Sequence, residues 1–265
     1  MIGRQTPPWR VGGASIRGSA HVRSGAPNQD CWLSRADNAM EASILAVSDG
    51  HGARAHFRSD KGAELAVQAA AAVLDAQLED ADGGELAGAI LARWRADVRA
   101  HMGAHPYTDA ERKLADHPPL SPYGATLIAA GISEGILALL QIGDGDLLLG
   151  YPDGRLERPL PAGPALKGEQ TFSLCQEDAQ TWFQSAVVWR SGGRAWPDFI
   201  FLSTDGVSKS FQNEASFLGE ITRLHERART DWQGLVDAAP AWLSTVSNNG
   251  SGDDATLCLA ARIQN

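Results

Sequence analysis

Apolar residues in this chain occur in two kinds of segment, which predict strands and helices. Short apolar runs bounded by Gly, Asp or Ser are typical of buried β-strands, and they lie at residues 43–48, 125–131, 135–142, 146–151, 182–189, 198–203 and 255–262. Longer segments repeat apolar residues every three or four positions, the spacing of one helix face, and they cover residues 65–76, 86–102 and 232–246. Pro240 falls inside the last segment, so we expect that helix to kink or to restart there.

The order of these segments predicts an α+β fold. Helices come in pairs, one pair before the central block of strands and one pair after it, and do not alternate with strands as in a doubly wound parallel sheet. We therefore expect a four-layer α-β-β-α sandwich, in which two antiparallel sheets are flanked by helix pairs. We take residues 1–265 as a single domain, with loops at 103–122 and 161–180.

Charge and cysteine content exclude several classes of protein. The formal net charge is -9, which repels nucleic-acid phosphates, so no nucleic-acid binding is expected. Cys31, Cys175 and Cys258 are far apart and odd in number, which predicts neither a disulfide framework nor a zinc site. The N-terminus lacks an apolar secretory core, and the most apolar stretch is interrupted at residues 133–135. We therefore expect no membrane contact and a cytoplasmic protein.

Acidic residues stand at the edges of the predicted strands: Asp30, Asp49, Asp144, Asp205 and the pair Asp253-Asp254. A single Asp-Gly is more often a turn than a ligand, and Asp153-Gly154 is expected to be a plain hairpin turn. Asp49 and Asp205 differ because each ends a run too apolar for an edge hairpin. Two carboxylates about 4 Å apart repel by about 4 kcal/mol at an effective dielectric constant of about 20. A hard divalent cation, Mg²⁺ or Mn²⁺, would offset that repulsion.

Short motifs around these aspartates resemble those of one enzyme family. In chain order they are NQD (28–30), DGHG (49–52), YGAT (123–126), GDG (143–145), TDGV (204–207) and DDAT (253–256). No single motif is specific, but their common order resembles the metal-dependent protein phosphatases, protein phosphatase type 2C, from residue 18 to residue 260. The segments GAPNQD and KGEQTFSL resemble the bacterial members. The resemblance implies hydrolysis of phosphoserine or phosphothreonine on a protein substrate, opposing a Ser/Thr kinase, by water activated at two Mn²⁺ or Mg²⁺ ions.

The resemblance also implies which residues hold the ions. Asp49 would bridge both ions, the Gly50 carbonyl would bind one, and Asp205 and Asp253 would hold the other. Asp144, together with Asp205, could serve a weaker third ion.

Further residues would act beside the ions. Asp30 would act through a water molecule, and Asp254 would have a supporting polar role. His51 is a candidate general acid for the leaving oxygen, although a loop histidine hydrogen-bonded near a helix start is an equally good interpretation. Thr126 and Gly124 are expected to pack where the sheets meet.

The chain departs from the family at the position that commonly holds substrate phosphate. Many members carry an arginine five residues before the first aspartate, where this chain has Gly25. Arg23 is the nearest substitute, and Arg54, Arg58 and Lys61 are further candidates.

Two alternatives therefore stay open. One is a catalytically weak pseudophosphatase that binds a regulatory partner, and the other is a phosphatase of small phosphorylated metabolites.

Overall fold

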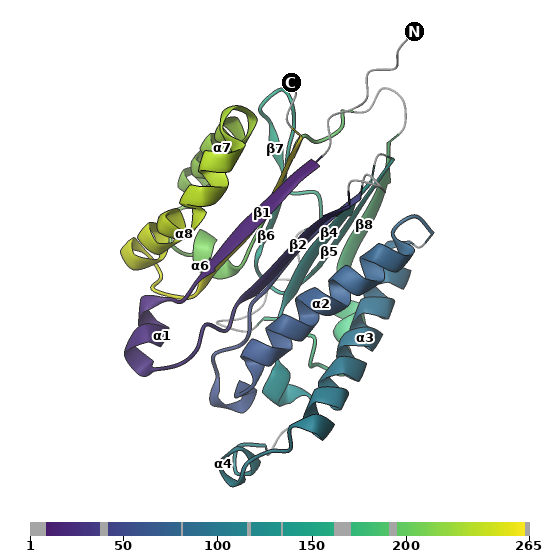
Figure 1. The fold of residues 1–265 in the computed structure, drawn as a ribbon, viewed down its shortest axis with the longest axis vertical. Helices are drawn as coiled ribbons and strands as arrows, with labels where there is room; N and C mark the ends of the chain where they lie inside the picture. The colour runs from purple at the N-terminus through teal and green to yellow at the C-terminus, as the bar shows by residue number, and fades with distance from the viewer. Residues whose placement is uncertain are drawn as a thin grey trace.

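The computed structural model describes residues 9–37, 42–80, 82–115, 118–133, 135–161, 171–190 and 195–262. Two β-sheets pack face to face at its centre, and a pair of long helices covers the outer face of each sheet (Figure 1). The four-layer α+β sandwich that the sequence predicts is therefore confirmed.

Each sheet contains five antiparallel strands. The first sheet holds, in spatial order, β1 (Trp9–Ile16), β10 (Ala255–Arg262), β9 (Phe199–Ser203), β6 (Asp146–Gly150) and β7 (Leu156–Glu157). The second sheet holds, in spatial order, β2 (Cys31–Asp37), β3 (Ala42–Ser48), β4 (Leu127–Ile132), β5 (Ile136–Ile142) and β8 (Gln184–Trp189). β10 pairs with β1 on one side and with β9 on the other, so it connects the N-terminal strand to the rest of the first sheet.

The helices of the described residues divide into four long ones, which cover the sheets, and several short ones. The long ones are α2 (Ser59–Gln77), α3 (Gly83–Ala104), α7 (Glu214–Thr230) and α8 (Trp232–Asn249). The short ones are α1 (Ser19–Ser24), α4 (Asp109–Arg112), α5 (Ala179–Trp182), α6 (Asp205–Ser208) and the 3-10 turns η1 (Arg54–His56) and η2 (Ser121–Tyr123). Helices α2 and α3 pack on the second sheet, and α7 and α8 pack on the first (Figure 1). Within the described ranges, none of the helices has the length and apolar character needed to span a bilayer.

Both faces of each sheet are buried. In β3, Leu45 and Val47 face the core between the sheets, whereas Ile44 and Ala46 pack under the α2–α3 pair. The other central strands alternate in the same way between the core and a helix pair. This double burial explains why the strands appear in the sequence as continuous apolar runs without polar alternation.

Capping residues mark the starts of the long helices. Asp82 before α3 and Asn213 before α7 each form a reciprocal capping box with the residue three positions on. Asp231 accepts a hydrogen bond from the Gly234 N–H at the start of α8. Pro240 lies inside α8, which continues to Asn249 as one helix, so the helix does not restart at the proline.

Some elements were not located by the sequence pattern. These are β1, α1 and β2 before the first predicted strand, η1 after it, α4 and η2 inside the predicted loop 103–122, and β7, α5, α6 and the long helix α7 in the second half of the chain. Asp153-Gly154 forms a turn between β6 and β7, with Gly154 at a φ of 88°. Part of the predicted loop 161–180, residues 162–170, lies outside the described residues.

Candidate active site

Antiparallel pairing brings two of the predicted acidic residues together in the second sheet. Cys31 at the start of β2 pairs with Ser48 at the end of β3. Asp30 and Asp49 are the adjoining residues just outside that pair, so both lie at the same end of the sheet.

The first sheet brings the other predicted aspartates to its corresponding end. Ser203 at the end of β9 pairs with Asp146 at the start of β6 and with Leu257 near the start of β10. The segments just beyond these strand ends contain the remaining aspartates, namely Asp144, Asp205, Asp253 and Asp254.

A cleft of about 1140 Å³ opens where these strand ends meet. Carboxylates from both sheets line it, because Asp49 comes from the second sheet and Asp144, Asp205 and Asp253 come from the first. The other predicted residues in its wall are Gly50 and His51. Further polar lining groups are His21, Gln29, His56, Thr171, Lys209 and Ser251.

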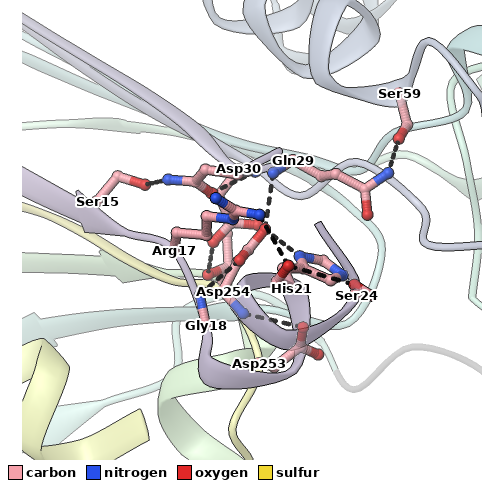
Figure 2. Close-up of polar contacts among 12 residues, drawn as sticks. Ser15, Arg17, Gly18, His21, Ser24, Gln29, Asp30, Ser59, Asp253 and Asp254 are labelled. Atoms are coloured by element: carbon pink, nitrogen blue, oxygen red, sulfur yellow. Dashed lines mark hydrogen bonds and ion pairs between the residues drawn. The ribbon is translucent and has the colours of Figure 1, made fainter. Parts of the chain in front are cut away.

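Asp254 is directed into the protein, whereas its neighbour Asp253 lines the cleft. The Asp254 carboxylate accepts hydrogen bonds from the backbone N–H groups of Gly18 and Gln29, each at 2.7 Å, and lies 2.8 Å from His21 Nδ1 (Figure 2). These contacts join the turn before β10 to α1 and to the segment that enters β2. Asp254 therefore supports the site from behind and leaves Asp253 at the surface of the cleft.

Asp30 is held behind the cleft wall by two hydrogen bonds. Its backbone N–H donates to Asn28 Oδ1 at 3.0 Å, and Thr204 Oγ1 donates to Asp30 Oδ2 at 2.7 Å. Burial is the largest cause that raises the pKa of Asp30 to about 8, the charges of Asp254 and Asp205 add to it, and the Thr204 bond opposes it. Thr204 follows β9, so this bond links the two sheets.

Asp49 is fixed through its backbone and not through its carboxylate. The Asp49 N–H donates to Thr126 Oγ1 at 3.0 Å, and the Thr126 N–H donates to the Asp49 carbonyl at 2.8 Å. No side chain in the described part of the chain donates a hydrogen bond to the Asp49 carboxylate. Burial and repulsion by Asp30 and Asp205 raise the pKa of Asp49 well above its usual range.

Asp205, at the start of α6, has a charged partner in the cleft. Lys209 Nζ contacts Asp205 Oδ2 and lies 3.8 Å from Asp144 Oδ2. Burial, followed by repulsion from Asp144, raises the pKa of Asp205 to about 6, and the contact with Lys209 opposes that rise. The backbone beside Asp205 is tightly packed, because a Cβ on Gly206 would lie 1.9 Å from the Asp254 carbonyl oxygen.

His51 belongs to a histidine pair in the cleft wall. Its ring packs edge-on against His56 with 4.9 Å between centroids, and its backbone N–H donates to the Gly124 carbonyl at 3.0 Å. Burial, with a smaller contribution from His56, lowers the pKa of His51 to about 4. The imidazole is therefore neutral at pH 7. A bound phosphate dianion would raise its pKa by favouring the charged form.

The cleft contains the ligand types that bind a hard divalent ion, but its described carboxylates are not positioned to coordinate one as they stand. In the described ranges, no group of three or more His, Cys, Asp or Glu side chains is arranged to hold a metal ion as it stands. The cleft nevertheless offers carboxylates together with backbone carbonyls, the ligands that Mg²⁺ and Mn²⁺ prefer. The Asp49 carboxylate is repelled by Asp30 and Asp205, and no described side chain donates a hydrogen bond to it, so a cation would stabilise it.

The candidate phosphate-binding cations lie elsewhere. Arg23 donates to Ser19 Oγ within α1 and is not among the lining residues. Arg58 pairs with Glu111, Lys61 pairs with Glu64, and Arg54 is exposed in η1, so none of these three lines the cleft either.

Sequence reasoning missed several polar residues around the cleft. Lys209 lies one helical turn after Asp205, a spacing that favours contact and was a usable signal. Gln29, inside the NQD motif, donates to the His51 carbonyl at 3.3 Å and to Ser59 Oγ at 2.6 Å. No pattern in the sequence indicates that contact, because it joins segments that only the fold brings together.

Residues 17–245 match the family described as protein phosphatase 2C. No curated protein matches the chain.

Several bacterial proteins have similar structures. One is PppA, described as a key regulatory component of T6SS in Pseudomonas aeruginosa, at 18% identity and a TM-score of 0.63, covering 97% of this chain and 98% of that one. Another is the catalytic domain of the serine threonine protein phosphatase PstP in complex with two manganese ions, at 19% identity and a TM-score of 0.61, covering 97% and 99%. A third is the Mycobacterium tuberculosis serine/threonine phosphatase PstP/Ppp, at 21% identity and a TM-score of 0.59, also covering 97% and 99%.

At these identities the structural matches establish the fold. The family match extends over most of the chain and includes Asp30, Asp49, Asp144 and Asp205, whereas Asp253 and Asp254 follow its last residue. The chain belongs to the protein phosphatase 2C family.

Proposed function

We propose that this protein is a metal-dependent serine/threonine phosphoprotein phosphatase. The observation that carries the proposal is the convergence of Asp49, Asp144, Asp205 and Asp253 on one cleft from the ends of two different sheets. Carboxylates that share a cleft in this way are costly unless cations balance them. Family membership gives that arrangement its chemical interpretation.

We assign two Mn²⁺ or Mg²⁺ ions to the cleft, held by Asp49, the Gly50 carbonyl, Asp205 and Asp253. The similar structure of PstP is described as a complex with two manganese ions, which supports this number. When bound, such ions supply activation of water near neutral pH and stabilisation of negative charge on phosphate. The chain's contribution is to hold the carboxylates in place through Thr126, behind Asp49, and Asp254, behind Asp253.

Two further residues would act on protons. His51 lines the cleft, and its ring would donate a proton from nitrogen to the departing serine or threonine oxygen after the phosphate has raised the pKa of the imidazole. Asp30, anchored by Thr204 behind the wall, would orient the attacking water. Cys175 also lines the cleft, but burial raises the pKa of its thiol, so it is a poor nucleophile and no phosphoenzyme is required.

Family membership supports a protein substrate, because the matching family is described as protein phosphatases. We therefore favour a phosphorylated protein, and with it a Ser/Thr kinase whose action this enzyme reverses. The unpaired thiols of Cys31, Cys175 and Cys258 suit a reducing compartment, so we propose the cytoplasm as the place of action.

One observation favours the pseudophosphatase as a second candidate. Among the described residues that line the cleft, none is an arginine, and Lys209 is the one lysine. A chain that binds metal and phosphoprotein without hydrolysing the ester would have these features.

The test measures hydrolysis of phosphothreonine peptides, an aryl phosphate and a sugar phosphate with Mn²⁺. We expect turnover of the peptides and the aryl phosphate, and Asp49→Asn should lower kcat by at least about 100-fold, on the scale of losing a preorganised charge contact to the transition state. Asp153→Asn, at the β6–β7 turn, is the matched control and should retain activity.

Three results would change the conclusion. Faster turnover of the sugar phosphate than of the peptides would favour a small-molecule phosphatase. Mn²⁺ binding with no hydrolysis of any substrate would favour the pseudophosphatase. Full activity of Asp49→Asn would refute the proposed site.

A further inference from the structure

Lys209 is the one lysine among the described residues that line the cleft, and none of those residues is an arginine. Its Nζ contacts Asp205 Oδ2 and lies 3.8 Å from Asp144 Oδ2. The two aspartates adjoin strands β9 and β6, which are neighbours in the first sheet. The ammonium thus spans two carboxylates that are 61 positions apart in the sequence and that the sheet brings side by side.

The backbone around this contact is well defined. The Lys209 N–H donates to the Asp205 carbonyl at 2.9 Å, which completes the single turn of α6. Asp144 accepts a hydrogen bond from Thr171 Oγ1 at 2.9 Å and follows Gly143, whose φ of 108° is accessible mainly to glycine. Hydrogen bonds within the chain therefore position both Lys209 and Asp144.

The charges around Lys209 favour its ammonium form. Its amine touches the Asp205 carboxylate and lies 3.8 Å from that of Asp144, and a lysine between two carboxylates is charged at neutral pH. Lysine carries a compact point charge with three donors, so one ammonium can serve two carboxylates at once.

The charge balance of the cleft indicates what this ammonium does. Four carboxylates line the cleft, from Asp49, Asp144, Asp205 and Asp253. Two divalent ions would balance those four negative charges, and the ammonium would leave one positive charge to attract a phosphate dianion. A third divalent ion would have to approach Asp144 and Asp205 against the positive charge already there.

We infer that Lys209 is a tethered cation that occupies the Asp144–Asp205 pair, so that the cleft takes two divalent ions and excludes a third. This inference rests on the proposed metal-dependent function and replaces the weaker third ion expected from the sequence. Lys209 acts here through the carboxylates and is a positioning residue for the metal centre.

The test counts Mn²⁺ ions bound per chain by equilibrium dialysis with electron paramagnetic resonance of the free ion. The native chain should bind two ions up to millimolar Mn²⁺. Lys209→Met, which keeps the length of the side chain and removes its charge, should bind one additional, weaker ion. Adding Asp144→Asn to that variant should abolish the additional ion.

Two matched variants separate charge from general effects of substitution. Lys209→Arg keeps a positive charge and should retain two ions. Lys61→Met removes a lysine that pairs with Glu64 outside the cleft, and it should also bind two ions. The Lys209 side chain is 58% exposed, so its replacement should leave the fold intact, which circular dichroism can verify.

The outcomes are distinct from those that test the phosphatase activity. A native chain that binds a third ion lost in Asp144→Asn would overturn the tethered cation. A Lys209→Met variant that still binds only two ions would also overturn the tethered cation. If that variant also had a raised KM for phosphopeptide, Lys209 would instead be a direct phosphate ligand. If the native chain binds two ions, the variants bind as predicted and no substrate is hydrolysed, this inference stands and the phosphatase activity is refuted. A native chain that binds no Mn²⁺ would overturn both this inference and the proposed function.

Discussion

Asparagine in place of Asp205 should stabilise the metal-free fold while it weakens the metal site. Asp205 is only 7% exposed, and its pKa rises from an ordinary value of 3.8 to about 6 because of burial first and repulsion by Asp144 second. Asparagine removes the charge and keeps an oxygen that can accept a hydrogen bond from Lys209.

The expected size of the effect follows from that shift. One pKa unit corresponds to about 1.4 kcal/mol, so the ionised carboxylate costs the folded state about 3 kcal/mol. The cost develops as pH rises from about 4, where the carboxyl group of the unfolded chain ionises, to about 6, where that of the folded chain ionises. At pH 7.5 it is fully present, and below pH 4 it vanishes because both states are protonated.

The assay is urea denaturation of the native chain and Asp205→Asn, in chelator and in excess Mn²⁺. In chelator at pH 7.5 the free energy of unfolding should rise by up to about 3 kcal/mol, and the melting temperature by about 2–4 °C per kcal/mol. Mn²⁺ at about 100 times its Kd should stabilise the native chain by about 2.7 kcal/mol and the variant by much less. The advantage of the variant should therefore shrink or reverse.

Asp237→Asn is the matched control, because Asp237 is exposed on α8 and accepts a hydrogen bond from Gln233 Nε2. It should change neither the stability nor the response to Mn²⁺. The reasoning fails if Asp205→Asn destabilises the metal-free chain by 1 kcal/mol or more at pH 7.5, or if its stabilisation persists unchanged at pH 4.

Two further predictions concern Asp254 and His51. Asp254→Ala would leave the buried Gly18 N–H and the part-buried Gln29 N–H without their acceptor, at about 1–3 kcal/mol for a buried group. The urea midpoint should therefore fall by the equivalent of about 3 kcal/mol, and an unchanged midpoint would contradict the anchoring role. His51→Gln should lower kcat by about 100-fold on alkyl phosphates and much less on p-nitrophenyl phosphate, whose leaving group needs no proton; equal losses would exclude the general acid. Because burial lowers the pKa of His51 in the free enzyme to about 4, kcat/KM on alkyl phosphates should fall as pH rises above about 4, with no inflection from His51 between pH 5 and 9.

The layered fold was predictable because its strands are buried on both faces. Runs such as residues 43–48 and 198–203 contain too little polar alternation for an exposed sheet, and helical segments at 65–76, 86–102 and 232–246 supplied cover for both sheets. The second helix of the later pair, α7, was not located. The N-terminal strands were harder to locate. β1 contains Gly12 and Gly13, and β2 includes Ser34 and Arg35, so neither forms a continuous apolar run.

The site was predictable where it depends on strand ends and not where it depends on side-chain packing. Aspartates that adjoin paired strand ends must lie at the same edge of a sheet, so strand pairing accounts for the approach of Asp30 to Asp49 and of Asp144 to Asp205. The convergence of the two groups depends on how the two sheets pack. The direction of Asp254 into the protein depends on donors from α1 and β2 that no local pattern reveals. Arg23 illustrates the reverse case, since closeness in sequence to the NQD motif does not bring it into the cleft.

The most direct test of the whole account is anomalous X-ray scattering from a crystal of this protein soaked in Mn²⁺. We predict two manganese peaks in the cleft, with Asp49 between them, Asp205 and Asp253 beside one of them, and Lys209 against Asp144. A crystal with no manganese peak among Asp49, Asp205 and Asp253 at saturating Mn²⁺ would contradict it.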